Sequence, residues 1–530
     1  DPLGLIDVVL MAPWRPEPQA IPNIDVDDAD VSPTRRLSVT SLASDITLDL
    51  IRGVPLEMCL QNFCLHFSTG RRSAALAKKG FELSRHTNQI AAFISHDWRT
   101  SRFSKTVALL LAFNSTYAAL AALLLNMLMC GLLLLDCLPG GWPTASASTY
   151  CVFCLVLCFW QRIRRCLCCR SILVFLDRLC IAQHDEDLKR RGILGLAAFL
   201  GKSQRLVVLW SPRYFSRLWC TFEIASWLKD EEVKPVEFVP VSMAMLLWSG
   251  ALLEAFLWWI FQFYVYIETD NVTLGFQGAV GVIATVLAFL LPAFLLAVPA
   301  QFYFGILHMR EVLKLKSQMA SFSIREADCS CCAMNHVHPV TGEAILCDRT
   351  LVFQTLRRWY TRTGDPDTHL DRFDALVREQ LSASVLRTLG SGAPPLRYVL
   401  AMLCAAPLAQ LPQYVSLGLR ESRGRGMGKW LLDWCKFPAL ALVMFGVAFC
   451  AWRKGAVWSR APLCATVPAL QCLVVCCVAA YWIPYEAVKL STGDDQFFEA
   501  IPLACMWIVL VLMYTRLYPS YIFGKSGSSS

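Results

Sequence analysis

The chain of 530 residues is 56% hydrophobic and only 17% charged, with a formal net charge of +8. Soluble domains are closer to half apolar and a quarter charged, so this composition argues against a wholly soluble protein and favours several membrane spans. The basic residues gather beside apolar runs, so we expect a lipid bilayer as a partner and no nucleic acid.

Before the first apolar run, the sequence divides into a tail, a helical segment and a strand. Residues 1–45 are rich in Pro, Asp and Ser without a sustained period, which predicts a disordered tail. A helical pattern follows over residues 46–86. The apolar stretch from Ile90 to Ile94, followed by polar residues, predicts a short buried strand.

Eight apolar runs are near the length of about 20 residues that a helix needs to cross a bilayer. Pro407 and Pro412 interrupt the fifth run, so that segment is also compatible with a re-entrant or surface-lying helix. Glu254 is the only ionisable residue that we find well inside a span. A transporter or channel would be expected to carry several, so a transporter or channel with a regulatory domain is the last of the three functions that we consider. The runs cover residues 105–135, 143–161, 240–267, 276–307, 396–419, 431–452, 462–485 and 500–518.

Basic residues follow the second and fourth runs, at positions 162–170 and 310–316. Because basic flanks stay on the cytosolic side, the segments 172–238 and 308–395 are both predicted to be cytosolic. Basic clusters on both sides of the last spans leave their orientation open, and the sequence does not indicate which membrane holds the chain.

Between the second and third runs, apolar strands alternate with helices. "SILVFLDR", "QRLVVLWS" and "VEFVPV" are typical of strands, and "LWCTFEIASWLKD" is typical of a helix. This alternation predicts a parallel sheet flanked by helices, with its ligand crevice beyond the carboxyl ends of the strands. The strand near Ile94 precedes the first two spans, and two spans return the chain to its starting side. We therefore predict an α/β domain split by a transmembrane hairpin and joined to an α-helical multi-span region.

These segments resemble a TIR (Toll/interleukin receptor homology) domain. The strand in "FISHDW" is similar to the family's first box, and "FLD", "RRGI" and "VVLWSPRYFSRLWCTFEIA" follow in the family's order within residues 88–103 and 171–241. The run "LDRLCIAQHD" also resembles the heterokaryon-incompatibility domains. Many TIR domains act by associating with themselves or with other TIR domains. The resemblance therefore implies a membrane-anchored signalling protein.

A subset of TIR domains cleaves NAD with a glutamate that follows a Trp-Cys pair by three residues, and Glu223 occupies that position here. The resemblance thus implies an alternative, a membrane-tethered NAD nucleosidase in which Glu223 stabilises positive charge on the ribose. Many NAD-cleaving relatives carry a basic residue near the position of Asp97, and Arg99 is the candidate to replace it. The residues implied in holding the dinucleotide are Ser95, His96, Asp97, Trp98, Arg99, Trp219 and Cys220.

Two simpler interpretations bear on the same residues. Glu223 could be a carboxylate placed near a helix amino terminus by the macrodipole, with no chemical role. Ser95, His96 and Asp97 are consecutive in an extended segment, so they point to alternating sides and cannot form a catalytic relay.

A second candidate site lies in "ADCSCCAMNHVHPVTGEAILCDR", where cysteines and histidines crowd into a short polar segment. The chain has 24 cysteines, but most lie in the apolar runs or the predicted cytosolic segments, so a secreted disulfide framework is not expected. A structural zinc ion takes four such ligands, so the alternatives are a zinc site and a packing of reduced thiols. The candidate ligands are Cys329, Cys331, Cys332, His336, His338 and Cys347.

The predicted domain order follows from these segments. It is a tail (1–45), a helical lead-in with the first strand (46–103), an inserted transmembrane hairpin (104–161), the rest of the sheet domain (171–241), a second transmembrane hairpin (242–307), a cytosolic Cys/His-rich and helical segment (308–395) and a carboxyl-terminal bundle of spans (396–519).

Overall fold

The computed structural model places most of the chain, and the fold is described for the residues it places. The predicted tail lies outside them. They are residues 50–67, 74–137, 142–229, 234–269, 287–288, 291–337, 342, 344, 347–361, 368–420, 427–458, 463–476 and 496–518.

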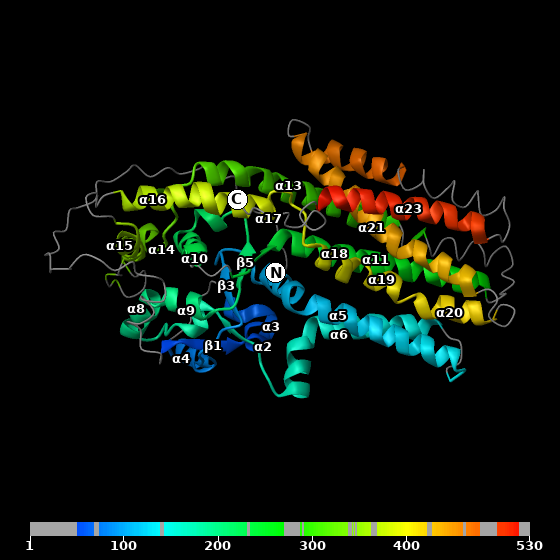
Figure 1. The fold of residues 1–530 in the computed structure, drawn as a ribbon, viewed down its shortest axis with the longest axis horizontal. Helices are drawn as coiled ribbons and strands as arrows, with labels where there is room; N and C mark the ends of the chain where they lie inside the picture. The colour runs from blue at the N-terminus through cyan, green and yellow to red at the C-terminus, as the bar shows by residue number, and fades with distance from the viewer. Residues whose placement is uncertain are drawn as a thin grey trace, which may run out of the picture. The chain divides into compact units, whose positions relative to one another are not determined.

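Six short strands form one mixed sheet in the order β2-β1-β4-β3-β5-β6 (Figure 1). Strands β4, β3, β5 and β6 are parallel neighbours, and β1 pairs antiparallel with both β4 and β2. Within the parallel part, the second strand along the chain precedes the first, third and fourth, which is the flavodoxin-like doubly wound order. The bounds are β1 Arg52–Pro55, β2 Arg85–His86, β3 Ala92–His96, β4 Leu173–Phe175, β5 Leu206–Trp210 and β6 Val236–Pro240.

The two segments that flank the first pair of long helices meet in this sheet. Phe93 of β3 is the register partner of Phe175 of β4, and their rings stack with centroids 4.3 Å apart. Strands β3 and β5 are buried along their whole length, as continuous apolar strands covered on both faces should be. The prediction that one sheet is assembled across an inserted helical pair is confirmed.

The structure corrects the prediction of a helical segment at 46–86. Strands β1 and β2 lie there, together with the short helices α2 (Leu56–Cys59), α3 (Gln61–Cys64) and α4 (Ala74–Glu82). Gly53 and Pro55 disfavour a helix interior, and pairing with β4 buries Val54 completely. Cross-strand pairing, which the local pattern does not show, decides the outcome.

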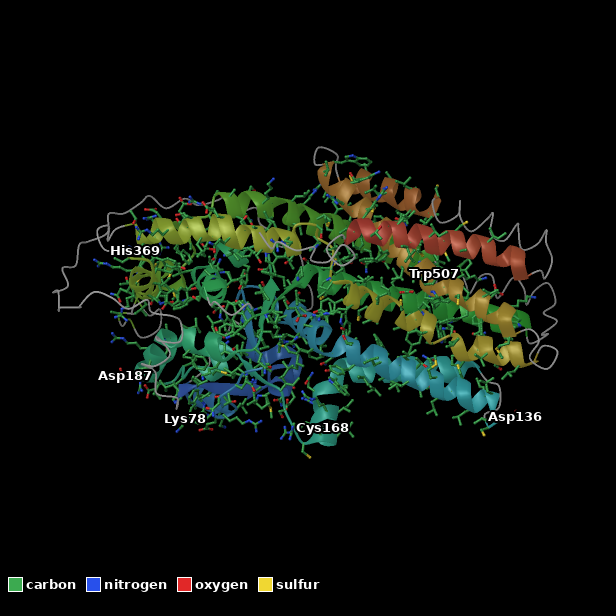
Figure 2. All side chains as sticks on the ribbon, in the orientation of Figure 1. Lys78, Asp136, Cys168, Asp187, His369 and Trp507 are labelled. Carbon is green, nitrogen blue, oxygen red and sulfur yellow. The ribbon has the colours of Figure 1, made fainter. Side chains whose placement is uncertain are left out.

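Helix α5 (Arg102–Leu134) starts directly after β3 and has two parts. Its first turns are buried at Val107, Leu109 and Leu111 and lie against β5 and β6, where the Arg205 guanidinium sits 4.5 Å from the Phe113 ring centroid. Beyond this, exposed apolar side chains such as Leu124 and Leu128 mark a surface suited to lipid. Helix α6 (Trp142–Cys168) packs along α5 and leads back to β4, and Figure 2 labels Asp136 at the tip of the pair.

Three helices in the described residues are long and apolar enough to cross a membrane: Arg102–Leu134, Val241–Ile260 and Met427–Val457. The run 396–419 is a pair of helices, Leu396–Leu403 and Ala405–Leu419, bent by 41°, as its prolines led us to expect. Of the other four predicted runs, 276–307 and 462–485 include residues outside the described part, 143–161 lies in α6, and 500–518 lies in the last described helix but for its final residue. Shorter apolar helices cover Leu463–Cys476 and Leu503–Leu517.

Besides Glu254, two ionisable residues lie near the start of the predicted run 431–452. Asp433 and Lys436 are both buried in the candidate span Met427–Val457, and Lys436 Nζ lies 3.0 Å from Asp433 Oδ1. The two residues are about one turn apart, so each compensates the other's charge within the helix.

The short helix η3 (Leu65–Phe67) follows α3, and the remaining helices complete the sheet domain and the segments that follow it. They are α7 Asp177–Cys180, α8 Glu186–Leu194, α9 Leu196–Lys202, η4 Tyr214–Ser216, α10 Leu218–Lys229, α11 Val241–Thr269, η5 Ala293–Ala297, α13 Val298–Ala320, η6 Ile324–Glu326, α14 Ser330–Ala333, α15 Asp348–Tyr360, α16 His369–Leu376, η7 Val377–Leu381, α17 Ser382–Leu389, α18 Leu396–Leu403, α19 Ala405–Leu408, α20 Leu411–Arg420, α21 Met427–Val457 and α23 Gln496–Leu517.

Candidate functional site

Polar side chains gather where β3 and β5 end, at the point where the strand order of the parallel sheet reverses. Doubly wound sheets bind ligands at this switch point because the connections on its two sides leave in opposite directions. We call these residues the sheet-edge cluster: Ser95, Asp97, Asp177, Tyr214, Arg217 and Glu223.

A chain of hydrogen bonds links the end of β3 to α10. Ser95 Oγ donates to Glu223 Oε2 at 2.5 Å, and it lies 2.6 Å from the hydroxyl of Tyr214. Since a serine hydroxyl has a single proton and Ser95 gives it to Glu223, Tyr214 is the donor to Ser95. The chain therefore runs from Tyr214 through Ser95 to the carboxyl group of Glu223.

Glu223 combines partial exposure with a strongly perturbed acidity. Burial disfavours its ionised form and raises its pKa to about 8, although the hydrogen bond from Ser95 acts in the opposite direction. It lies in the second turn of α10, beyond the first turn where the macrodipole acts, so the interpretation as a helix amino-terminal carboxylate is not supported. A carboxyl group that solvent reaches and that is largely neutral near pH 7 is a candidate for chemistry.

Two further carboxylates of the cluster are held by cations and an indole. Asp97 is buried, and its Oδ1 lies 3.8 Å from Nε of Arg217. Asp177 accepts a hydrogen bond of 3.0 Å from the indole of Trp98, and burial raises its pKa. Lys105, in the first turn of α5, is fully buried and donates to the backbone carbonyl of Trp98 at 3.3 Å. The edge of the sheet is thus tied to the start of a candidate span.

The structure separates the residues that the sequence grouped as dinucleotide-binding. Arg99 is exposed, so the arginine that lies beside Asp97 is Arg217 and not Arg99. His96 is buried between the rings of Phe67 and Trp98, and burial together with nearby Lys105 lowers its pKa, so the imidazole is neutral. Cys220 is buried with its thiol 3.5 Å from the carbonyl of His96. As predicted, Ser95, His96 and Asp97 form no relay, because Ser95 bonds to Glu223 and Tyr214.

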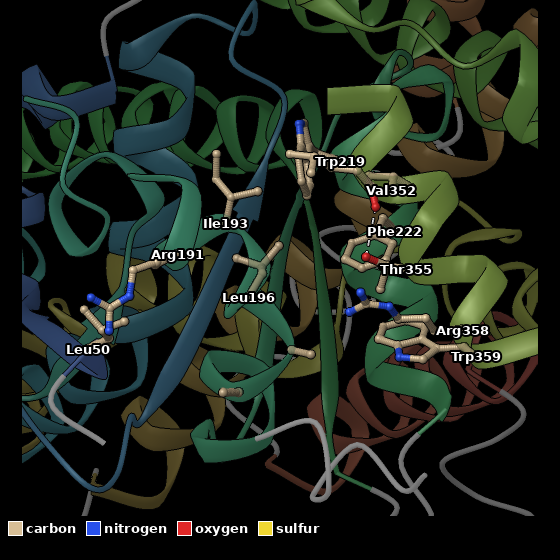
Figure 3. A pocket seen from close by; sticks show the side chains of 13 residues that line it. Leu50, Arg191, Ile193, Leu196, Trp219, Phe222, Val352, Thr355, Arg358 and Trp359 are labelled. Carbon is tan, nitrogen blue, oxygen red and sulfur yellow. Dashed lines mark hydrogen bonds between the residues drawn. The ribbon is translucent and has the colours of Figure 1, made fainter. Parts of the chain in front are cut away.

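A cavity of about 230 Å³ opens beside α10, between α8, α9 and α15 (Figure 3). Its wall contains Trp219 and Phe222 of α10, with Arg191 and Arg358 at its margins, and neither Ser95 nor Glu223 lines it. Trp219, predicted to hold the dinucleotide, lines this cavity and donates to Asp348 Oδ2 at 3.1 Å. Glu223 is therefore half-buried outside this cavity, with its carboxyl group bonded to Ser95.

The Cys/His segment forms a compact group, which we call the Cys/His cluster: Cys331, Cys332, His336 and Cys347. One potential ligand atom from each lies within 4.8 Å of the others. Cys329 is buried with its sulfur 3.1 Å from that of Cys331, in a second group that includes Asp348. His338, the sixth predicted ligand, lies outside the described residues.

The Cys/His segment is bonded directly to the start of α10. Backbone N–H of Leu218 donates to the carbonyl of Asp328 at 3.1 Å, and that of Asp328 donates to Ser216 at 2.6 Å. Arg217 contacts both sites, since it donates to Ser330 Oγ at 3.0 Å and approaches Asp97. The sequence signal for this bridge was weak: Arg217 stands two residues before Trp219, and Lys105 is the first residue of the predicted apolar run 105–135.

Comparisons with family models, with curated proteins and with solved structures found no match to this chain, so the residues of the two clusters carry the functional argument.

Proposed function

We propose that this chain is a membrane-anchored signalling protein whose TIR-like sheet domain acts by association with further copies or with other TIR-like domains. The continuity between the sheet and the candidate spans supports this best. Residues 97–101 separate β3 from α5, residues 169–172 separate α6 from β4, and β6 passes into α11 without a loop. Because rigid elements joined by short connections transmit displacements, a change in the spans reaches the sheet edge directly.

Association is tested with the full chain, labelled separately with donor and acceptor fluorophores and reconstituted together in lipid vesicles. We expect energy transfer above the level set by random proximity, and competition by unlabelled chain. Energy transfer that stays at the random level across all protein densities would contradict the proposal. A matched pair, Glu223→Gln and Glu379→Gln, should both leave association unchanged, because Glu379 is an exposed carboxylate on η7 and association does not need Glu223.

A second candidate function, NAD cleavage at Glu223, is favoured by one observation: the bond between Ser95 and Glu223 at the switch point of the sheet. In this reaction the bond between nicotinamide and ribose breaks, and the nicotinamide nitrogen keeps the electron pair. Water then supplies a hydroxyl to the ribose carbon and releases a proton. A carboxylate beside the ribose stabilises the positive charge that develops there.

The raised pKa of Glu223 is compatible with such a substrate. The nicotinamide ring of NAD is cationic, and a cation close to a carboxyl group favours its ionised form. Substrate binding would thus ionise the group that the reaction needs. Ser95 would have to release or share its hydrogen bond to Glu223, and the bond between Tyr214 and Ser95 would change with it.

The enzymatic proposal is tested by incubating the full chain in lipid nanodiscs with NAD and measuring released nicotinamide. We expect release that Glu223→Gln abolishes and that Glu379→Gln leaves intact. No release at high protein density would contradict the enzymatic function and leave association as the proposed activity. Release that persists in Glu223→Gln would remove Glu223 from the catalytic role.

A further inference from the structure

We propose that Cys331, Cys332, His336 and Cys347 bind one zinc ion, and that this zinc site fixes the amino-terminal end of α10. Three thiolates and one imidazole are a ligand set that structural zinc sites use, and zinc prefers them in a closed tetrahedron. The inference does not rest on the function proposed above, because it concerns a separate set of side chains and a different readout.

The distances within the Cys/His cluster suit a tetrahedral ion. A zinc–sulfur bond of about 2.3 Å places two sulfur ligands of a tetrahedron about 3.8 Å apart. The sulfur atoms of Cys332 and Cys347 are separated by 3.8 Å. All four ligand atoms already lie within 4.8 Å of one another, so small side-chain rotations complete the coordination.

Two neighbouring residues are left out of the ligand set for stated reasons. The sulfur of Cys329 is 3.1 Å from that of Cys331, which is shorter than the edge of a zinc–thiolate tetrahedron. The carboxylate of Asp348 already accepts the indole N–H of Trp219 at 3.1 Å. The backbone N–H of Asp348 points to Cys331 Sγ at 3.2 Å, and such a bond supports a thiolate ligand from outside the coordination sphere.

The backbone at His336 indicates that its position is enforced. Asn335 and His336 both adopt left-handed conformations, with φ of 52° and 57°; asparagine accepts this conformation readily at a helix end, whereas it is uncommon for histidine. This turn folds His336 back over α14, where its N–H donates to the carbonyl of Cys331 at 3.0 Å. Nε2 of His336 is buried and has no hydrogen-bond partner among the described residues, whereas a metal bond at the imidazole would fix the ring and compensate the turn.

The zinc site would act on α10 through the residues that surround its ligands. Asp348 follows the ligand Cys347 and holds Trp219, and Ser330 precedes the ligand Cys331 and accepts from Arg217. The backbone of Asp328 pairs with Ser216 and Leu218. Binding energy at the metal therefore orders the segment that carries Arg217, and Arg217 in turn faces Asp97 of the sheet-edge cluster.

The first test measures metal in the full chain, purified in detergent without chelators. We expect about one zinc ion per chain and, after replacement by cobalt, the thiolate-to-cobalt charge-transfer absorption of a tetrahedral site. Cys332→Ser and Cys347→Ser should each lower zinc content at least tenfold, whereas Cys329→Ser should retain it. Wild-type chain that takes up no zinc or cobalt would overturn the proposal, as would equal loss in Cys329→Ser and Cys347→Ser.

The second test needs no variant and so does not depend on variants that fold poorly. Hydrogen exchange is followed in the wild-type chain before chelation, after chelation and after zinc is restored. We expect exchange at residues 216–219 to accelerate at least tenfold without zinc and to recover with it, while exchange in β5 stays slow. Unchanged exchange at 216–219 in a chain that has lost its zinc would refute the link to α10.

Discussion

The sheet-edge cluster and the Cys/His cluster lie on two sides of the same helix start, yet they satisfy their polar groups differently. At the sheet edge, Tyr214 bonds to Ser95 and Ser95 bonds to Glu223, so the protein itself supplies the partners in that chain. In the Cys/His cluster, His336 adopts a costly backbone conformation, and its buried Nε2 has no hydrogen-bond partner among the residues that the structure describes. The first region must be opened to bind a ligand, whereas the second is completed by one.

The largest effect expected on the sheet side comes from Phe93→Ala. Phe93 is fully buried against Phe175, and removing its ring should lower the free energy of unfolding of the sheet domain by about 3–5 kcal/mol. Phe63→Ala is the control, because that ring is 66% exposed. Thermal unfolding in detergent measures both, and the cobalt absorption of the Cys/His cluster should be unchanged below the transition. A loss under about 1 kcal/mol would mean that the sheet does not depend on this contact.

Ser95→Ala tests whether the sheet-edge chain is self-sufficient. It removes the donor to Glu223 and the acceptor for Tyr214, so we expect a loss of about 1–3 kcal/mol. It also removes the contact that lowers the pKa of Glu223, so that pKa should rise further. Ser317→Ala, at an exposed serine that bonds within its own helix, should have little effect on the same unfolding measurement. Equal stability of the two variants would contradict the closed chain.

Glu223→Gln should stabilise the protein in a pH-dependent way. Because its pKa is near 8 in the folded state and near 4.5 otherwise, the unfolded chain releases its proton first, and stability falls as pH rises between these values. Glutamine cannot ionise, so the variant should match the wild type near pH 4.5 and exceed it above pH 8. Allowing for solvent screening of this partly exposed group, we expect about 1–2 kcal/mol. The melting temperature of each variant is measured across this pH range, with Glu379→Gln as the control. The same dependence of melting temperature on pH in both variants would contradict the prediction.

The smallest effect should come from Arg213→Ala, which breaks an exposed ion pair between the two regions. Arg213 lies 3.2 Å from Asp328, and both side chains are more than 40% exposed. Exposed pairs of this kind contribute less than about 1 kcal/mol. A double-mutant cycle with Asp328→Ala measures the coupling energy between the two side chains. A coupling energy above about 2 kcal/mol would contradict the prediction that the backbone bonds at Ser216 and Leu218 hold the two regions together.

Sequence patterns predicted the buried parallel strands well because their signal is local. β3, β4, β5 and β6 are short runs of apolar residues, and each was found close to its expected position. β1 and β2 were missed because they exist only through pairing, and nothing in "RGVP" alone distinguishes a short strand from a turn. The apolar lengths also predicted the candidate spans, but they concealed Asp433 and Lys436, since one ion pair barely alters the hydropathy of a long helix.

At the sites, sequence reasoning found residue types and the structure supplied their neighbours. Glu223 and Ser95 were both named, but their direct bond depends on how α10 packs on β3. Arg217 and Lys105 were not named as site residues, because a basic residue near an apolar segment is ordinarily a flank. Six metal ligands were proposed from the sequence, and among the five that the structure describes, distances between side chains group Cys331, Cys332, His336 and Cys347.

The position of α5 determines where the chain can be truncated to obtain a soluble fragment. At 33 residues the helix is about 50 Å long, and its first third is part of the wall of the sheet while the remainder presents apolar side chains outward. The boundary between the water-soluble and the lipid-facing material thus falls inside a continuous helix and not in a linker. Any soluble fragment designed for crystallography must keep Arg102–Phe113 and end the helix afterwards, because trimming at the end of β3 would strip the sheet of its cover.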